Sequence, residues 1–548
     1  MAWYDNAVFY HIYPLGLCGC PHENKGEAGS HFDILNEWAA HASRIGCTAI
    51  YIGPLFESGS HGYDTNDYRM VDRRLGTNDD FKQFVKNCHG RGMKVIVDGV
   101  FNHTGRGFWA FQDLLKYRDH SRYRGWYCDV NFWGNNEYND GFSYANWGGH
   151  NMLVKLNVWN PEVRDYLFET VRFWVREFDI DGIRLDAADV LDFGFMRDLR
   201  GVCDSLKSEF WLMGEVIHGD YSRWANEGML HSVTNYELHK GLFSGHNDHN
   251  YFEIAHSIRR LNGIVGDKIR LYTFVDNHDV SRIRSKLNNK AHLSNVMMLL
   301  YTVPGIPSLY YGSEFGIEGD KQRGSDWNLR PALKLSDFSE DMPLCRLITA
   351  LGRIKKQFPE VTWGEYKELH LTTRQFAFAR ILNGRAVITA LNNDDHGTHL
   401  EIPLPVCANE AVNLLTLQEE TQEDREAAAA ERARKMKEDK RVLTAGLKEL
   451  KDASSSLTKA VREALSAAAA ADEYGPSLKE QMEAAFREVE GSIRLVTAAY
   501  DRSAEKCGAP ALEARGSTEG CESMEIRDGK LIVDLGPNSG LVACVSNK

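Results

Sequence analysis

Short apolar runs alternate with amphipathic helical segments over roughly the first 340 residues, and this alternation most constrains the fold. Near-continuous apolar strands separated by helices are typical of a parallel sheet covered by helices on its faces. Helical patterns lie at 31–46, 78–92 and 161–178. Eight strand candidates predict an α/β chain with a closed (β/α)8 TIM barrel. These candidates are residues 7–16, 47–56, 93–103, 179–190, 210–219, 232–238, 269–279 and 307–316.

One of these strands, GIRLDAAD at 182–189, carries two charged residues among apolar ones. Side chains of a strand alternate between faces, so Arg184 and Asp186 share one face and Ile183 and Leu185 share the other. Isolated buried charges are costly, so these residues form either a structural ion pair or a nucleophile with its positioning cation. This stretch alone leaves both interpretations open.

The chain divides into four predicted regions. The barrel takes residues 1–103 and 156–345, and an irregular, aromatic-rich loop domain at 104–155 follows the third strand. An antiparallel β-sandwich is predicted for 346–416 and 521–548. Its hairpins turn at Asn383-Gly384 and Asp528-Gly529.

The fourth region, residues 417–520, is rich in Ala, Glu and Lys and interrupts the β-sandwich. Apolar side chains recur there at helical spacing, which predicts an inserted all-α helical bundle. These stripes are Leu443, Leu447 and Leu450; Leu457, Val461 and Leu465; and Met482, Phe486, Val489, Ile493, Val496 and Tyr500. The insert is interpreted as a partner-binding module with an unknown partner, a natural domain, an engineered graft or a solvated spacer.

Charge and composition restrict the partners and the compartment. A formal net charge of −13 argues against nucleic acid as a partner. No apolar run of about 18 residues exists to cross a membrane, and the N-terminus does not read as a signal peptide. Eleven cysteines include no CxxC pair, and the one close pair, Cys18 and Cys20 near His22, is interpreted as free thiols in preference to a metal site. We therefore expect a cytoplasmic protein.

Polar residues gather at the predicted carboxyl ends of four strands. Because these ends open onto one face of a barrel, the side chains should converge there. The set contains Asp98, Asn102, His103, Arg184, Asp186, Glu215, His278 and Asp279. Any one of them is more often structural, but the set together favours a catalytic site.

These stretches resemble the α-amylase family of glycoside hydrolases. The segments DGVFNH, GIRLDAAD, GEVIHG and FVDNHD are similar to its four signature regions, in order. The segment LVKLN at 153–157 resembles neopullulanases, cyclomaltodextrinases and maltogenic amylases. The resemblance covers residues 1–416 and 521–548 and leaves out the insert.

The resemblance implies a role for each site residue. Asp186 would be the nucleophile, Glu215 the general acid and then the base, and Asp279 a holder of sugar hydroxyls. Arg184 would keep Asp186 ionised, with a depressed pKa. A retaining mechanism places the two reacting carboxyl groups about 5–5.5 Å apart. The other substrate-binding residues implied are Tyr63, which would stack beneath the sugar, His103 and His278, which would hydrogen-bond it, and Asp98.

The implied activity is hydrolysis of α-1,4-glucosidic bonds in maltodextrins through a covalent glycosyl-enzyme. Two alternatives stay open: a 4-α-glucanotransferase-type transglycosylase, and a catalytically silent barrel that serves as a binding scaffold. No cofactor is required. Whether the chain binds calcium stays open. Asn102 matches one calcium-ligand position of the family, but the sequence Ala-Ala-Asp after Asp186 differs from that of the calcium-dependent members. Candidate sugar contacts in the loop domain are Trp109, Trp126, Trp133 and Trp147.

Overall fold

The computed structural model describes residues 2–266, 268–416, 434, 441, 459, 463, 518 and 521–547. The chain splits into two compact units, one of Met1–Leu417 with Gly516–Lys548 and one of Gln418–Arg515. The helical bundle predicted for 417–520 lies outside the described residues. The exceptions are Arg434, Arg441, Lys459 and Glu463, which are helical, and Thr518.

Eight parallel strands form the barrel, in the order β11-β10-β9-β5-β2-β1-β13-β12. A parallel bridge between Thr234 and Tyr272 joins the two outer strands of this sheet and closes the ring. The predicted TIM barrel is therefore confirmed. The strands are β1 (Phe9–Ile12), β2 (Ala49–Ile52), β5 (Lys94–Gly99), β9 (Gly182–Leu185), β10 (Trp211–Gly214), β11 (Ser232–Val233), β12 (Tyr272–Phe274) and β13 (Ile306–Tyr310).

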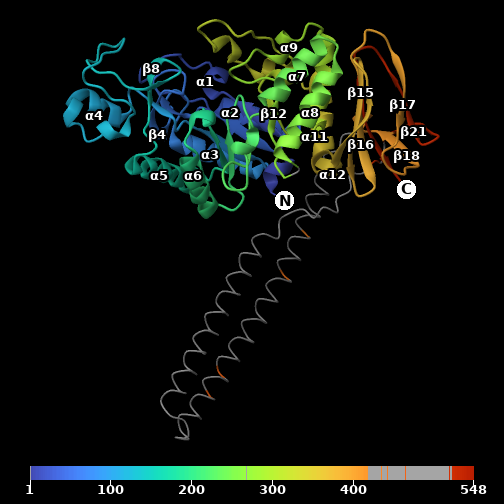
Figure 1. Ribbon diagram of the computed structural model, residues 1–548, viewed down its shortest axis with the longest axis horizontal. Coiled ribbons are helices and arrows are strands. Elements are labelled where there is room, and N and C mark those ends of the chain that lie inside the picture. The colour runs from blue at the N-terminus through green and yellow to red at the C-terminus, as the bar shows by residue number, and fades with distance from the viewer. Residues whose placement is uncertain are drawn as a thin grey trace. The chain divides into compact units, whose positions relative to one another are not determined.

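Helices surround this ring, as Figure 1 shows. Capping residues define where two of these helices begin. Thr77 and Asp80 form a capping box at the N-terminus of α3, and Asn160 caps α5, whose first residue is Pro161. The longer helices are α2 (Phe32–Arg44), α3 (Asn78–Gly90), α5 (Pro161–Phe178), α6 (Phe193–Leu206), α7 (Tyr236–Asn247), α8 (Tyr251–Val265), α10 (Leu293–Thr302) and α11 (Pro343–Gln357). Shorter ones are α1 (Pro14–Leu17), α4 (Trp109–Tyr117), α9 (Ile283–Lys286) and α12 (Pro359–Trp363).

The two faces of each barrel strand bury different side chains. Ile183 and Leu185 of β9 pack outward into the main hydrophobic core. A second cluster with Phe9, Tyr51 and Trp211 fills the interior of the ring. The first strand is shorter than the predicted 7–16, because Pro14 fixes a helical φ and begins α1.

Two excursions from the barrel border the carboxyl ends of the strands. A hairpin of β3 (Phe56–Ser58) and β4 (Thr65–Val71) follows β2. The segment after β5 is more regular than the loop we expected, since it contains α4 and an antiparallel sheet. That sheet comprises β6 (His103–Gly105), β7 (Asn146–Trp147) and β8 (His150–Lys155). Its strands are too short for an alternating pattern to reveal them.

Two antiparallel sheets make up the C-terminal part, seen in orange and red beside α12 in Figure 1. One has the order β14-β15-β16-β22-β18-β19, and the other β17-β21-β20. Both predicted turns are confirmed, with positive φ at Asn383, Gly384, Asp528 and Gly529. The strands are β14 (Glu365–Leu371), β15 (Gln375–Leu382), β16 (Arg385–Asn392), β17 (Thr398–Pro403), β18 (Glu410–Asn413), β19 (Glu522–Ser523), β20 (Ile526–Arg527), β21 (Lys530–Leu535) and β22 (Gly540–Ser546).

Among the residues described, no helix combines the length and the apolar character needed to cross a bilayer.

Candidate active site

A cavity of about 590 Å³ lies at the carboxyl ends of the barrel strands. Asp186 follows β9 directly, and Glu215 follows β10, so these short strands set where both carboxylates lie. The lining includes five of the predicted site residues, namely Tyr63, His103, Asp186, Glu215 and Asp279. Asp98, Arg184 and His278 do not line it, but each contacts a residue that does.

The Arg184 guanidinium connects three of the carboxylates. Its Nη1 lies 2.8 Å from Asp98 Oδ1 and 2.9 Å from Asp186 Oδ1, and its Nη2 lies 2.8 Å from Glu215 Oε2. Arg184 is 3% exposed, so these ion pairs are shielded from solvent. One planar cation thus holds Asp186 and Glu215 on the same side of the cavity.

The pKa of Asp186 differs from our expectation. Burial raises it well above the ordinary value for an aspartate, and the charges of Glu215, Asp98 and Asp279 add to that effect, while Arg184 opposes it. The prediction of a depressed pKa is therefore wrong for the free protein, because it considered only the arginine.

Hydrogen bonds orient the Glu215 side chain. Tyr236 Oη donates to Glu215 Oε1 at 3.2 Å, and the Ala187 backbone N–H donates to Oε2 at 3.3 Å. Asn277 Nδ2 in turn donates to Tyr236 Oη at 3.3 Å. Glu215 therefore has a fixed direction toward the cavity.

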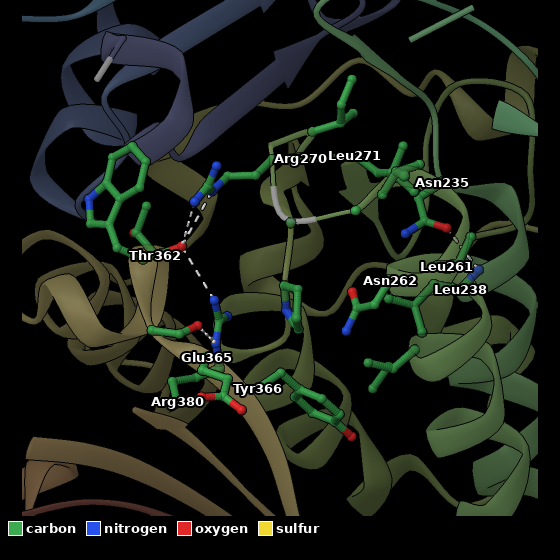
Figure 2. Close-up of a pocket in the computed structure, with 18 residues that line it drawn as sticks. Asn235, Leu238, Leu261, Asn262, Arg270, Leu271, Thr362, Glu365, Tyr366 and Arg380 are labelled. Atoms are coloured by element: carbon green, nitrogen blue, oxygen red, sulfur yellow. Dashed lines mark hydrogen bonds between the residues drawn. The ribbon is translucent and has the colours of Figure 1, made fainter. Parts of the chain in front are cut away.

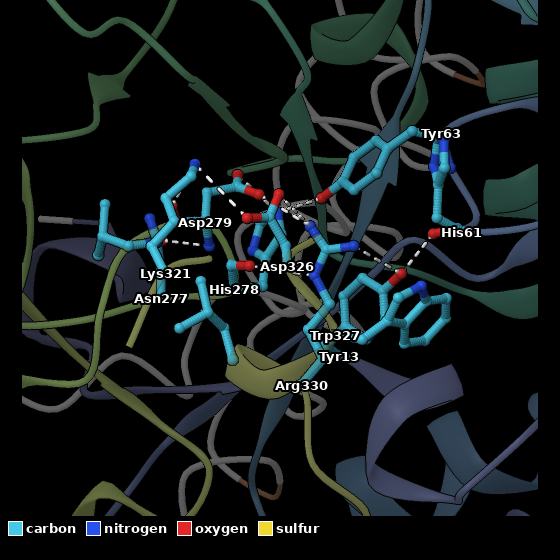
Figure 3. Close-up of polar contacts among 12 residues, drawn as sticks. Tyr13, His61, Tyr63, Asn277, His278, Asp279, Lys321, Asp326, Trp327 and Arg330 are labelled. Carbon is cyan, nitrogen blue, oxygen red and sulfur yellow. Dashed lines mark hydrogen bonds and ion pairs between the residues drawn. The ribbon is translucent and has the colours of Figure 1, made fainter. Parts of the chain in front are cut away.

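Asp279 lies in a network of cations and rings, drawn in Figure 3. Arg330 Nη2 contacts its Oδ1 at 2.9 Å, and His278 Nε2 lies 3.0 Å from its Oδ2. Although burial opposes the shift, His278 and then Arg330 lower the pKa of Asp279, so this carboxylate stays ionised. Lys321 Nζ also donates to the Asp279 backbone oxygen at 2.8 Å.

The aromatic residues around the cavity hold one another in place. His278 Nε2 lies 2.5 Å from Tyr63 Oη, and that hydroxyl also donates to Asp98 Oδ2 at 3.3 Å. His103 Nε2 donates to the Tyr63 backbone oxygen at 3.1 Å, and burial lowers the pKa of His103 to about 3. His103 is consequently neutral near pH 7.

Several residues that line the cavity were not predicted for these positions, among them Arg330, Tyr236 and Lys321. Arg330 comes well after the signature segments, and only the folded chain brings it to Asp279. The prediction of a strand over 232–238 is wrong at Tyr236, because β11 ends at Val233 and Tyr236 begins α7, and nothing in that segment indicated contact with Glu215.

Of the four candidate tryptophans, only Trp147 lines this cavity. Trp126 is buried and donates to Glu162 at 3.0 Å, so it packs the loop domain. Trp109 packs against Tyr123 and Trp126 and is partly exposed, and Trp133 is 99% exposed.

The two candidate metal positions, Asn102 and the pair Cys18 and Cys20, make contacts within the protein. Asn102 Nδ2 donates to His103 Nδ1 at 3.2 Å, and Cys18 and Cys20 are buried free thiols. In the described part of the chain, no three His, Cys, Asp or Glu side chains are grouped so that they could hold a metal ion. Calcium also binds Asn and backbone carbonyl oxygens, so Asn102 as a calcium ligand stays a prediction, and we derive no catalytic step through a metal.

The family model described as "Alpha amylase, catalytic domain" matches residues 41–342, which is more than half of the chain. The chain belongs to the alpha-amylase family of glycoside hydrolases. A cyclomaltodextrinase from a Bacillus species is 28% identical over 72% of this chain and 74% of its own length. Neopullulanase 2 from Thermoactinomyces vulgaris is 30% identical over 71% of this chain and 70% of its own.

Other relatives and solved structures agree with this family. The chain spans 61% of a 31% identical cyclomaltodextrinase from Thermoanaerobacter pseudethanolicus, which matches 64% of this chain. A solved cyclomaltodextrinase aligns with a TM-score of 0.68 at 26% identity, covering 75% of this chain and 73% of its own. A debranching enzyme from Nostoc punctiforme aligns with a TM-score of 0.65 at 27% identity, covering 73% and 92%.

Proposed function

We propose that this member of the alpha-amylase family hydrolyses α-1,4-glucosidic bonds of maltodextrins with retention of configuration. The observation that carries the proposal is the shared contact of Asp186 and Glu215 with Arg184 at the cavity. A guanidinium that contacts both carboxylates keeps them within reach of one sugar ring, as a double displacement requires.

In the proposed mechanism, Glu215 protonates the leaving glycosidic oxygen while Asp186 attacks the anomeric carbon. Glu215 then removes a proton from water, which attacks the glycosyl-enzyme and releases Asp186. The ionised Asp279 and the neutral His103 would bind sugar hydroxyls, and the charge of Arg184 would stabilise Asp186 as the leaving carboxylate.

The substrate class is supported by the relatives. Two relatives that each match over 425 residues are named cyclomaltodextrinase and neopullulanase 2, and we propose that this chain also acts on α-glucans. Trp147 and Tyr63 supply aromatic faces along the cavity for sugar rings.

We also propose a cytoplasmic location, since the ten described cysteines are free and one relative is an intracellular maltogenic amylase from Bacillus subtilis.

Product analysis on maltohexaose, a cyclodextrin and pullulan tests the proposal. We expect the wild type to cleave at least one of these glucans. NMR of the reaction mixture should show that the α-anomer of the product forms first. Glu215→Gln should lower kcat by about 10²–10⁴-fold, because a proton donor is lost. An exposed control, Glu227→Gln, should leave kcat unchanged.

Each alternative has its own outcome in this experiment. Release of the β-anomer contradicts retention and points to carboxyl groups about 6.5–9.5 Å apart. Products longer than the substrate indicate transfer to sugar in place of water. All three glucans left intact by the wild type favour a binding scaffold.

A further inference from the structure

One cationic side chain of the active-site cavity, Lys321, has no role in the mechanism proposed above. It lies between β13 and α11 and lines the cavity together with Asp326 and Arg330 of the same segment. Its Nζ donates to the Asp279 backbone oxygen at 2.8 Å and lies 3.6 Å from Asp326 Oδ1, as drawn in Figure 3. These contacts hold the ammonium group in the part of the cavity around Asp279.

The backbone around Lys321 is held in place without the ammonium group. The Lys321 backbone N–H donates to Ser281 Oγ at 2.8 Å, and the Gly319 N–H donates to Ser285 Oγ at 2.9 Å. The Lys321 side chain is 54% exposed, and an ion pair as exposed as this one adds little to the stability of a fold. A structural role therefore does not explain why an ammonium group lies here.

The ammonium group can still donate to a ligand. It carries three N–H donors. Within the described residues, Lys321 uses one of them on the Asp279 backbone oxygen and directs another at the Asp326 carboxylate. Because the side chain is half-exposed at the cavity, the third donor is within reach of a ligand there. A sugar hydroxyl offers lone pairs that accept such a charge-assisted hydrogen bond.

The order of the barrel strands indicates which sugar unit this donor meets. Asp186 follows β9 and Glu215 follows β10, whereas β13 lies across the ring, three strands from β10 and four from β9. In the proposed mechanism Glu215 protonates the departing sugar, so the departing part of the glucan lies beside β10. The retained part then extends toward the segment after β13, where Lys321 lies next to Asp279.

We propose that Lys321 is a specificity-determining residue, which binds the second sugar unit on the retained side of the cleaved bond. Asp279 holds the first retained unit, the one that reacts, and Lys321 donates to a hydroxyl of the next. The enzyme consequently favours substrates that fill this second position. The inference rests on the proposed function, because the roles of Asp186 and Glu215 define the two sides of the cavity.

Two nitrophenyl glycosides with the same leaving group test the proposal. p-Nitrophenyl α-glucoside places one sugar unit on the retained side, and p-nitrophenyl α-maltoside places two. Lys321→Met removes the ammonium group and keeps an unbranched side chain. We expect it to lower kcat/KM for nitrophenolate release from the maltoside about tenfold or more, as loss of a charge-assisted hydrogen bond predicts. The kcat/KM for the glucoside should stay within about twofold of the wild type.

Lys334→Met is the matched control. Lys334 is an exposed lysine of the segment between β13 and α11, and it is not among the residues that line the cavity. Both kcat/KM values should therefore equal those of the wild type.

Two kinetic results would overturn the proposal. An equal fall in kcat/KM for both glycosides would show that Lys321 acts on the reacting unit through Asp279. An unchanged kcat/KM for the maltoside would show that the ammonium group does not bind the second unit.

Failure of the proposed function gives a different result, since the wild type would then release nitrophenolate from neither glycoside. Calorimetric titration with maltotriose decides the inference in that case. A lower affinity in Lys321→Met supports sugar binding by Lys321, and an affinity equal to that of the wild type overturns it.

A second cavity provides the control for this titration. Figure 2 shows this cavity, of about 540 Å³, whose lining includes Leu238 of α7, Asn262 of α8 and Tyr366 of β14. None of its lining residues lines the active-site cavity. Asn262→Trp, which puts a large side chain into it, should leave the affinity for maltotriose unchanged. A lower affinity in that variant would place the sugar in the second cavity and contradict the proposal.

Discussion

At the residue scale, the site combines a few reactive groups with many that orient them. Asp186, Glu215 and Asp279 could be predicted from the sequence, because each belongs to a signature segment and lies shortly after the end of a barrel strand. Arg330 could not, because its contact with Asp279 depends on the path of the chain after β13. The raised pKa of Asp186 was missed for a similar reason, since burial and three other carboxylates are set by the fold.

Tyr236 is a positioning residue for Glu215. Its hydroxyl donates to Glu215 Oε1 at 3.2 Å, so Tyr236→Phe removes that bond without changing the size of the ring. We expect kcat to fall about tenfold with little change in KM, and the pH profile of kcat to shift. Tyr117→Phe, at an exposed position, is the matched control. A pH profile identical to that of the wild type would argue against positioning.

Arg330 holds Asp279 in a way that lysine cannot reproduce. Its guanidinium contacts Asp279 Oδ1 at 2.9 Å, donates to the His278 backbone oxygen at 3.0 Å and reaches Tyr13 Oη at 3.2 Å. A lysine keeps the charge but lacks the planar fork. Arg330→Lys should therefore lower kcat/KM by about 10–100-fold in a maltohexaose assay. An unchanged kcat/KM would show that charge alone suffices.

At the element scale, strand and helix positions could be predicted well where apolar periodicity is strong. All eight barrel strands overlap their predicted segments, although β1 and β11 are shorter, and both tight turns lie where expected, because burial on both faces and Asn-Gly or Asp-Gly pairs leave clear patterns. The sheet of β6, β7 and β8 could not be predicted, since long-range pairing holds its short strands together.

Helix α7 makes the stability of the barrel depend on pH. Burial lowers the pKa of both His239 and His246 to about 3. Their pKa in the unfolded chain is about 6.5, so between these values the unfolded state binds more protons and the free energy of unfolding falls as pH falls. Each histidine should lower the free energy of unfolding by about 2 kcal/mol when the pH falls from about 7.5 to about 5.

Urea unfolding of the wild type and His239→Leu at these two pH values measures this effect. The variant loses a packed ring over Phe274, so its stability is lower at both values, but its loss on acidification should be smaller by about 2 kcal/mol. Equal losses in both proteins would show that His239 is already protonated, or does not titrate differently on unfolding.

At the scale of the whole molecule, Met1–Leu417 and Gly516–Lys548 together form a compact unit that does not include Gln418–Arg515. Strands β18 and β19, on either side of that segment, pair directly through Val412 with Ser523 and Asn413 with Glu522. The Glu522 backbone N–H also donates to Thr416 Oγ1 at 2.9 Å. The two chain ends are therefore adjacent and already hydrogen-bonded to each other.

Deletion of residues 418–515 should consequently leave a working enzyme. Residues 414–417 and 516–521 would remain as a ten-residue connection between β18 and β19, which is still within the range of loop lengths in compact domains. We expect kcat/KM on maltohexaose within about twofold of the full chain and a Tm of the first unit within a few degrees, because no described contact of the active site is removed. A shortened chain that keeps its Tm but loses activity would assign Gln418–Arg515 a part in catalysis, whereas loss of both would show that the first unit needs that segment to fold.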